Sequence, residues 1–412
     1  MLGKVRYYMN KMNFKNGVKE WILSIQHLFA MFGATVLVPL LVGINPSVAI
    51  LTAGLGTLIF HLCTKGKVPA FLGSSFAFIA PIISVSTMYG FEYVQGSVIV
   101  VGLAYALMSF LVYKVGAKRI SKFLPPHIVG AMIIIIGLTL IPSAITNVQT
   151  HISIATITLT VSLLITFFGK GFLKQLGILM GVIVGYLLAL WVGLVDTSII
   201  TNASLFSNPI TFTVPKFGLD AMMIIVPLAI CTILEHIGDI TTNGTVVGKD
   251  FVKDPGLHRT LLGDGLATAM AGLFGSVPNT TYGENTSLLA ITKNYNPKLL
   301  RRTSIIAIVL SFIGVFGAIL QSVPACVIGG ISLQLYCMIA WIGVKNIKDN
   351  KSYVNPYKVA VILVMLVIGL GNLIGLNFSI ALGSVTLSGL SLAGVIGIIL
   401  NAILMRFDRK AK

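Results

Sequence analysis

Charged residues are scarce in this chain. Asp, Glu, Lys and Arg together make up 10% of its 412 residues, whereas a soluble domain carries about 25%. Hydrophobic residues make up 56%, and the mean hydropathy is +0.95. Apolar runs of about 20 residues, long enough to cross a bilayer as helices, recur about fourteen times. The composition excludes an ordinary soluble domain and predicts an all-α polytopic membrane protein.

Cysteine and recognisable catalytic motifs are also scarce. The four cysteines, Cys63, Cys231, Cys326 and Cys337, form no CxxC pair and lie inside or at the ends of apolar runs. Small apolar packing is therefore the better interpretation than metal binding or disulfides. We find no HExxH motif, no clustered metal ligands and no nucleophile with an evident base. We expect no metal, no cofactor and no enzymatic reaction.

Basic residues are in excess, with a formal net charge of +17. Their distribution explains the excess, because every Lys and Arg except Lys216 falls on one side of an alternating fourteen-span topology. The positive-inside rule then places both termini in the cytoplasm of a multi-pass plasma-membrane (cell inner membrane) protein. We therefore expect the lipid bilayer, and not nucleic acid, as the partner. The first apolar run is too long for a cleavable signal and is expected to be retained.

The predicted spans alternate with short polar loops. They cover residues 20–43, 47–64, 68–90, 96–114, 125–146, 152–169, 173–195, 219–241, 259–275, 277–292, 303–321, 324–344, 357–375 and 388–405. A polar segment, Asp196 to Gly218, joins the two groups of seven and is expected to be extracytoplasmic and partly extended.

Two motif pairs indicate an internal repeat. Gly66-Lys67-Val68-Pro69 resembles Gly275-Ser276-Val277-Pro278, and the stretch from Leu124 to Ile133 resembles that from Val323 to Ser332. Each pair is separated by about half the chain, in the same order. Because seven is odd, the second half would insert upside down relative to the first. Inverted repeats of this kind are typical of secondary transporters.

Spans 3 and 10 both begin with Val-Pro followed by glycine and small polar residues, which favour helix poorly. Broken spans at matching positions of two repeats are the best sequence indication of a transporter's substrate site. Unpaired backbone N–H donors would lie at the starts of the two half-helices, near Ser75-Phe76 and Gly283-Glu284. Ordinary kinked helices are the alternative.

Three of the twelve acidic residues, Glu235, Asp239 and Glu284, lie inside apolar segments. A carboxylate at the bilayer centre costs at least ~2.5 kcal/mol and marks function by default. Asp264, near the start of span 9, is interpreted as a cap or a solvated residue. His236 is expected to point away from the Glu235–Asp239 face and to be structural.

No Lys or Arg lies deep in a predicted span, which disfavours an anionic substrate. Helix starts supply donors and carboxylates supply acceptors. A flat molecule with alternating N–H and C=O groups, such as uracil or another cyclic ureide, would satisfy both. Buried carboxylates also bind protons more readily than exposed ones unless they are hydrogen-bonded, which suits proton coupling.

Five stretches resemble one known family. "SIQHLFAMFGATVLVPLL", "PAFLGSSFAFIAP", "LEHIGD", "DPGLHR" and "GSVPNTTYGENTSLLAIT" are similar to the nucleobase–ascorbate transporter family, uracil permease branch. The likeness extends over essentially the whole chain, and "NTTYGEN" is specific because purine-transporting relatives usually carry a different motif.

The resemblance implies fourteen spans in two inverted seven-span repeats, with a short β-strand in each of spans 3 and 10. Residues 1–122 and 219–322 would form a core domain, and residues 123–218 and 323–412 a gate domain. The family's members are proton symporters and often homodimers.

The resemblance also implies site residues. Glu235 and Glu284 would hydrogen-bond uracil, the amides of Phe76 and Gly283 would meet its carbonyls, Ala34 would pack near it and Tyr336 would face it from the gate. Ser75 and Tyr282, which flank the two amides, are assigned to the same site. His27 is interpreted as a structural hydrogen-bonding residue of the core, with a role in proton transfer as the alternative.

One residue departs from the branch pattern. Asp239 stands where uracil permeases typically carry a histidine linked to proton coupling, so we assign coupling to Asp239, Glu235 and Glu284. Asp is frequent there in purine-transporting relatives, which keeps xanthine or uric acid open as substrates. An anion transporter or channel of the same architecture is the alternative from another class.

Overall fold

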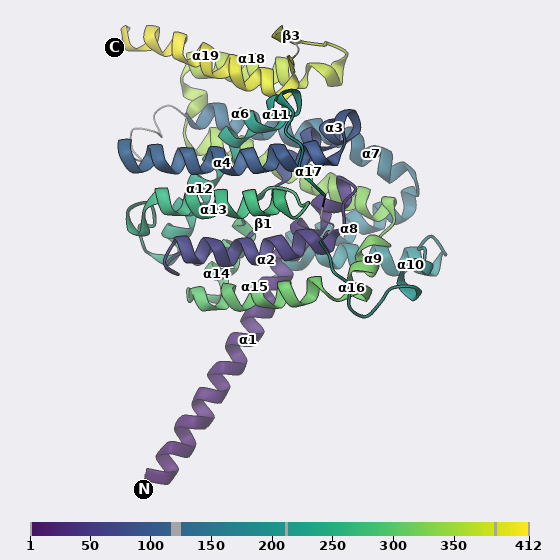
Figure 1. Cartoon of the computed structure of the whole chain (residues 1–412). Helices are drawn as coiled ribbons and strands as arrows, with labels where there is room; N and C mark the ends of the chain where they lie inside the picture. Colours follow the sequence, from purple (N-terminus) through teal and green to yellow (C-terminus); the bar gives the residue numbers. More distant parts are fainter. Residues whose placement is uncertain (1, 117–124, 211–212, 383–384, 411–412) are drawn as a thin grey trace.

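A computed structural model describes residues 2–116, 125–210, 213–382 and 385–410. The described chain is mostly helical, and the helices pack into one body from which the N-terminal end of the first helix projects (Figure 1). The predicted boundary between core and gate at residues 122 and 123 lies outside the described residues.

The helices of the first half follow the predicted apolar runs. They are α1 (Leu2–Leu41), α2 (Pro46–Cys63), η1 (Phe76–Phe78), α3 (Ile79–Tyr89), α4 (Phe91–Val115), α6 (Pro126–Thr139), α7 (Ile141–Gln149), α8 (Ile152–Phe168), η2 (Leu173–Leu176), α9 (Gly177–Trp191) and α10 (Ser198–Thr201). Local sequence sets several starts: the Asn45 side chain caps α2 by accepting from the Ser47 amide, and Pro46 occupies the first turn.

The second half is built in the same way. Its helices are α11 (Leu219–Ile225), η3 (Val226–Leu228), α12 (Ala229–Val247), η4 (Val252–Gly256), α13 (Leu257–Leu273), α14 (Gly283–Thr292), α15 (Pro297–Ser311), α16 (Gly314–Gln321), α17 (Ala325–Asp349), η5 (Ser352–Val354), α18 (Pro356–Leu370), η6 (Gly371–Ile374) and α19 (Gly389–Lys410).

Eight helical segments of the described chain are long and apolar enough to cross a membrane, and three shorter apolar ones accompany them. Helix is present in every range predicted to span, although α1 begins well before residue 20 and α12 continues past residue 241. The number of spans and the inverted repeat stay predictions.

A hairpin between α18 and α19 was not predicted. Strands β3 (Ser379–Leu382) and β4 (Val385–Ser388) pair antiparallel, with Ser379 opposite Ser388. Part of the sequence signal was present, because apolar and polar residues alternate in Val385-Thr386-Leu387-Ser388, directly after Gly383-Ser384. The predicted extended character of the segment after Asp196 appears as a single bridge between Phe206 and Ile313.

The two strands predicted in spans 3 and 10 are present and pair with each other. β1 (Leu72–Ser74) runs antiparallel to β2 (Asn279–Thr281), with Gly73 opposite Thr280. Two further backbone bonds of 2.9 Å extend the ladder, from the Ser75 amide to the Pro278 carbonyl and from the Tyr282 amide to the Phe71 carbonyl. β1 lies in the middle of the helical body (Figure 1), so helices cover this irregular backbone as a membrane protein requires.

Small residues let the helices around this sheet approach closely. A Cβ atom built on Gly102 of α4 would lie 2.5 Å from the Gly265 carbonyl of α13. Likewise, a Cβ atom on Gly56 of α2 would lie 2.6 Å from the side-chain Nδ2 of Asn279. Close packing through glycine is the usual means by which membrane helices associate.

Candidate substrate-binding site

The β1–β2 pair places the starts of two helices on either side of one short ladder. η1 begins just after β1, and α14 begins just after β2. Because the strands are antiparallel, the two helix starts lie at opposite ends of the ladder, separated by about three residues or ~10 Å of strand. The first amides of each helix have no acceptor within that helix and carry a partial positive charge.

The start of α14 is accessible. Tyr282 occupies the N-cap position in an extended conformation (φ −100°, ψ 119°), and Gly283 and Glu284 follow with exposed surfaces. A Cβ atom on Gly283 would meet no atom within 4 Å. Open space therefore lies directly in front of this helix start.

The start of η1 is more enclosed. Ser75 is buried and extended (φ −85°, ψ 125°), and its hydroxyl has no hydrogen-bond partner among the described residues. Phe76 is half-buried and packs against the apolar cluster that contains Ala34 and Phe71. The predicted residues Ser75, Phe76 and Ala34 are thus neighbours of the same ladder end.

Helix α12 presents two acids to accessible space. Glu235 is exposed and Asp239 half-buried, and Gly238 between them has nothing within 4 Å of a built Cβ atom. At about 100° per residue, these three positions share one face of the helix. The Glu235 carboxylate lies within electrostatic range of the Glu284 carboxylate, and α12 packs against α14, so the two predicted glutamates lie in the same region.

Asp239 is tied to the sheet. Its Oδ2 accepts a hydrogen bond of 3.1 Å from the Thr281 hydroxyl of β2. Its carboxylate also lies within electrostatic range of Glu235 and Glu284. Three carboxylates from α12 and α14 therefore form one group.

The structure gives Tyr282 a bracing geometry. Its ring is buried, its hydroxyl donates to the Ser74 carbonyl at 3.0 Å, and the Thr35 hydroxyl donates to it at 3.2 Å. The ring also occupies the space beside Gly73, where a Cβ atom would lie 2.5 Å from Cζ. Tyr282 thus joins α1, β1 and the start of α14.

Tyr336 of α17 is fully buried. It belongs to the same apolar cluster as Ala77 and Phe78 of η1. The predicted gate residue is therefore packed among apolar side chains, in the cluster that also covers the first helix start.

Three asparagines that the sequence did not single out as a set hold the crossing together. The Asn243 side chain donates to the Pro69 carbonyl and the Thr286 hydroxyl, and Asn279 donates to the Thr52 and Ala267 carbonyls. Asn285 donates to the His27 carbonyl at 3.0 Å and contacts its Nδ1 at 3.2 Å. The predicted structural role of His27 is confirmed by these contacts.

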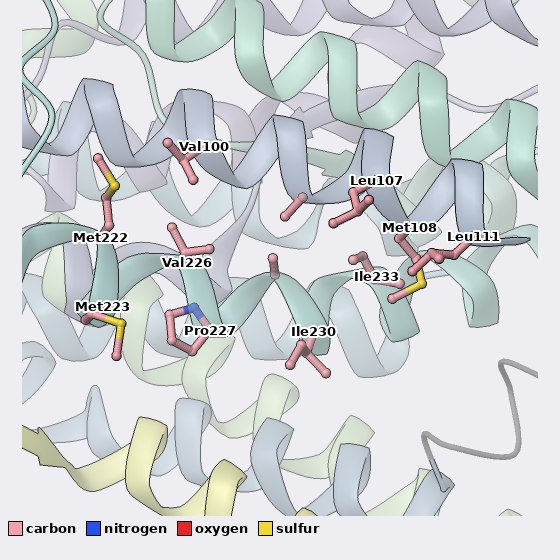
Figure 2. A pocket seen from close by; sticks show the side chains of 12 residues that line it. Val100, Leu107, Met108, Leu111, Met222, Met223, Val226, Pro227, Ile230 and Ile233 are labelled. Carbon is pink, nitrogen blue, oxygen red and sulfur yellow. The ribbon is translucent and has the colours of Figure 1, made fainter. Parts of the chain in front are cut away.

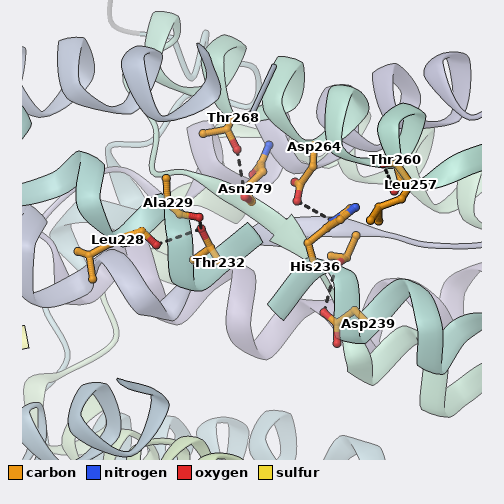
Figure 3. Close-up of polar contacts among 11 residues, drawn as sticks. Leu228, Ala229, Thr232, His236, Asp239, Leu257, Thr260, Asp264, Thr268 and Asn279 are labelled. Atoms are coloured by element: carbon orange, nitrogen blue, oxygen red, sulfur yellow. Dashed lines mark hydrogen bonds and ion pairs between the residues drawn. The ribbon is translucent and has the colours of Figure 1, made fainter. Parts of the chain in front are cut away.

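The prediction that Asp264 is a cap or a solvated residue is wrong. Asp264 lies two turns into α13, fully buried, and its Oδ2 is 2.9 Å from Nδ1 of the equally buried His236. Figure 3 shows the two side chains directed at each other. Sequence position near a helix start misled the prediction, because the buried face of α13 here packs against α12. His236 points away from the Glu235 face, as expected.

A separate apolar cavity of about 450 Å³ lies between α4 and the α11–α12 segment (Figure 2). Its walls are entirely apolar: Val100, Ala104, Leu107, Met108, Leu111, Met222, Met223, Val226, Pro227, Ala229, Ile230 and Ile233. Ile230 and Ile233 lie on the side of α12 opposite Glu235. A polar ring would find no hydrogen-bonding side chain in this cavity, so it is not the predicted site.

Known sequences match nearly the whole chain. A profile described as the permease family matches residues 18–378. A uracil permease of Bacillus caldolyticus is 42% identical over 404 residues, covering 94% of this chain and 92% of the relative. The uracil permease of Escherichia coli K12 is 40% identical over 393 residues, covering 92% and 90%.

Solved structures share the fold at low identity. The inward-facing murine solute carrier 26 A9 anion transporter has a TM-score of 0.72 at 10% identity, covering 95% of this chain and 68% of that one. The transmembrane domain of the cyanobacterial bicarbonate transporter BicA has a TM-score of 0.61 at 13% identity, covering 94% and 97%. This likeness concerns the fold alone.

The apolar helices, the crossed strands and the match over residues 18–378 agree. The chain is a membrane protein and a permease, not an enzyme, and it belongs to the permease family known as the nucleobase–ascorbate transporters.

Proposed function

We propose that this permease imports uracil together with protons across the plasma membrane. The observation that carries the proposal is the juxtaposition of Glu235 and Glu284, both exposed, at the accessible start of α14. The identity of about 40% to uracil permeases supports the choice of base.

The binding chemistry follows from the donors and acceptors around the crossing. The amides of Gly283 and Phe76 donate to the two carbonyls of uracil, and the carboxyl groups of Glu235 and Glu284 bind its ring N–H groups. Ala34 and Tyr336 close the apolar sides of the site. Ser75 and Tyr282 keep the two helix starts in place.

Proton coupling rests on the crowding of three carboxylates, Glu235, Asp239 and Glu284. Like charges at short range repel, and a proton that enters the group relieves this repulsion. Asp239 takes the place of the histidine typical of uracil permeases and carries the proton as a carboxyl group.

Transport proceeds by alternating access. The core, residues 1–122 and 219–322, moves against the gate, residues 123–218 and 323–412, once substrate and proton are bound. Both termini face the cytoplasm, and two copies form a homodimer in the bilayer.

Uptake by purified protein in proteoliposomes tests the proposal. Labelled uracil is expected to accumulate when an inward proton gradient is imposed and only to equilibrate without one. Excess unlabelled xanthine or uric acid should leave uracil uptake unchanged. Inhibition by those purines would favour the other-nucleobase alternative. Chloride- or sulfate-dependent current without uracil uptake would favour the anion alternative.

The Asp239→Asn variant tests the coupling residue. We expect it to weaken the dependence of uptake on the proton gradient more than it weakens equilibrium uracil binding, because Asp239 bonds to Thr281 and flanks the site. Gradient dependence equal to wild type would remove Asp239 from the coupling group.

A further inference from the structure

The His236–Asp264 pair lies directly behind the proposed site and has no role in the function proposed above. Both side chains are fully buried, and their 2.9 Å contact is the only polar contact that either makes among the described residues. Two aromatic rings enclose His236: Phe60 of α2 at 6.3 Å and Tyr105 of α4 at 6.5 Å between ring centroids. Helices α2, α4 and α13 therefore shield the pair from water.

Burial decides the charge of the pair. A carboxylate removed from water is stable only if its partner neutralises it, and an unpaired buried charge is strongly destabilising. With two protons in all on the imidazole and the carboxyl group, the pair has no net charge, whichever of the two groups holds the second proton. The pair then adds no charge to the neighbouring site.

The place of His236 beside Glu235 in α12 indicates the function of the pair. His236 follows Glu235 in α12, so its side chain points about 100° around the helix from the Glu235 side chain. Fixing the imidazole to Asp264 of α13 fixes the rotation of α12, and with it the direction of Glu235. Asp239, one turn later, is fixed separately by Thr281.

We propose that His236 and Asp264 form a net-neutral positioning pair that aims Glu235 at the substrate without itself taking part in proton transfer. This inference rests on the proposed function only for the identity of the substrate.

Other titratable groups surround the pair. Tyr105 of α4 and the α12 acids Glu235 and Asp239 lie within electrostatic range of Asp264, and His61 of α2 packs against Phe60 beside His236. His61 is held by the Ala70 carbonyl at 3.1 Å. In this region the acidic side chains with accessible surface are Glu235 and Asp239 of α12 and Glu284 at the start of α14.

Uracil binding by purified protein tests the positioning role. Asp264→Ala and His236→Ala are expected to weaken binding by at least about tenfold per folded molecule, because Glu235 loses its orientation. Asp264→Asn is expected to stay within about threefold of wild type, since the amide oxygen still accepts from the imidazole. If Asp264→Ala lowers thermal stability but the folded fraction binds uracil as wild type does, the pair is merely structural and the proposal fails.

Chemical labelling of Glu235 tests the neutrality of the pair without uracil. Dicyclohexylcarbodiimide reacts with protonated carboxyl groups, and mass spectrometry gives the pH at which half of Glu235 is labelled. Asp264→Asn should leave this midpoint unchanged, whereas the matched charge control Asp239→Asn should lower it by about one pH unit. An equal shift in both variants would show that the pair is anionic and overturn the proposal. If wild-type protein bound no uracil, the proposed function would fail, while the labelling result would still decide the charge of the pair.

Discussion

The two strand-to-helix crossings share an extended residue before the helix start but carry different side chains. β1 leads into η1 and β2 into α14, each through a residue with extended backbone, Ser75 and Tyr282. After β1 the chain continues with Phe76, Ala77 and Phe78, and after β2 with Gly283 and Glu284.

Because their side chains differ, the two crossings offer different groups to the substrate. Both crossings supply backbone donors, but only the second supplies a carboxylate, and its partner Glu235 comes from α12. The first crossing is packed in apolar clusters, whereas the second opens onto accessible space. Variants can separate the contribution of each crossing.

The largest effect is expected from the acids at the second crossing. Glu284→Gln or Glu235→Gln should lower uracil uptake at least about 100-fold, because each removes a charged hydrogen-bond acceptor from the site. Folding should persist, since both side chains are exposed. Uptake in proteoliposomes, together with gel filtration, measures both quantities.

Asp349→Asn is the matched control. Asp349 is exposed at the end of α17, far along the chain from either crossing, and its variant should transport at the wild-type rate. Wild-type transport by both glutamate variants would refute the assignment of the site.

A pair of glycine variants sharpens the comparison. Gly73→Ala should destabilise the protein by about 1–3 kcal/mol, because the new Cβ would lie 2.5 Å from the Tyr282 ring. Gly283→Ala should keep wild-type stability, since its Cβ meets nothing within 4 Å, yet weaken uracil binding by obstructing the amide. Thermal unfolding and binding measured on both variants would separate the crossings; equal losses of stability would contradict the difference.

Tyr282→Phe is expected to have a smaller effect. The variant loses the hydrogen bond to the Ser74 carbonyl, which costs about 1–2 kcal/mol of stability when the acceptor stays buried. Uracil affinity should change only severalfold if the tyrosine is a brace. A loss of affinity as large as that of Glu284→Gln would instead make the hydroxyl a substrate ligand.

The smallest effect on stability is expected from a substitution in the loop before β1. Lys67, which precedes β1, bonds to Asp254 at 2.6 Å on the exposed surface, whereas its counterpart Ser276, before β2, bonds to Thr52 at 2.9 Å in the core. The hydrogen bond from Lys67 holds the pKa of Asp254 below its usual value. A lowered carboxyl pKa stabilises the fold above the unfolded pKa, and this contribution is lost as the pH falls through the lowered value.

Lys67→Ala should therefore shift the melting temperature less than Tyr282→Phe does, because exposed ion pairs contribute little. The shift should be constant near neutral pH and should vanish in acid. Melting curves of wild type and variant across pH measure it, and a shift that grew on acidification would contradict the assigned sign.

Several features could be predicted because they depend on local sequence. Val-Pro followed by small residues interrupts a helix wherever it occurs, so the broken starts of spans 3 and 10 could be recognised. Acids in apolar segments are rare enough to identify Glu235, Asp239 and Glu284. Strand β4 of the hairpin had a readable alternation, which the helical interpretation of the neighbouring segments obscured.

Other features depend on contacts between distant segments. No local pattern shows that Asp264 meets His236, or that Asn243, Asn279 and Asn285 connect α1, α2, α12, α13 and α14 around the two strands. These contacts depend on how α12, α13 and α14 are rotated and stacked, which side-chain packing over the whole body decides.

The sequence by itself determined that this is a membrane protein, at which positions its helices are interrupted, and which acidic residues lie in apolar segments. Hydropathy and helix propensity determine these features because they act over a few residues. Only the tertiary structure decided that the two interrupted helix starts pair as strands, that Glu235 lies within electrostatic range of Glu284, and that Tyr282 braces the crossing. The strand pairing and the Tyr282 contacts join residues about two hundred positions apart, and the two glutamates come from different helices. A chain specifies such neighbours only through the packing of the complete fold.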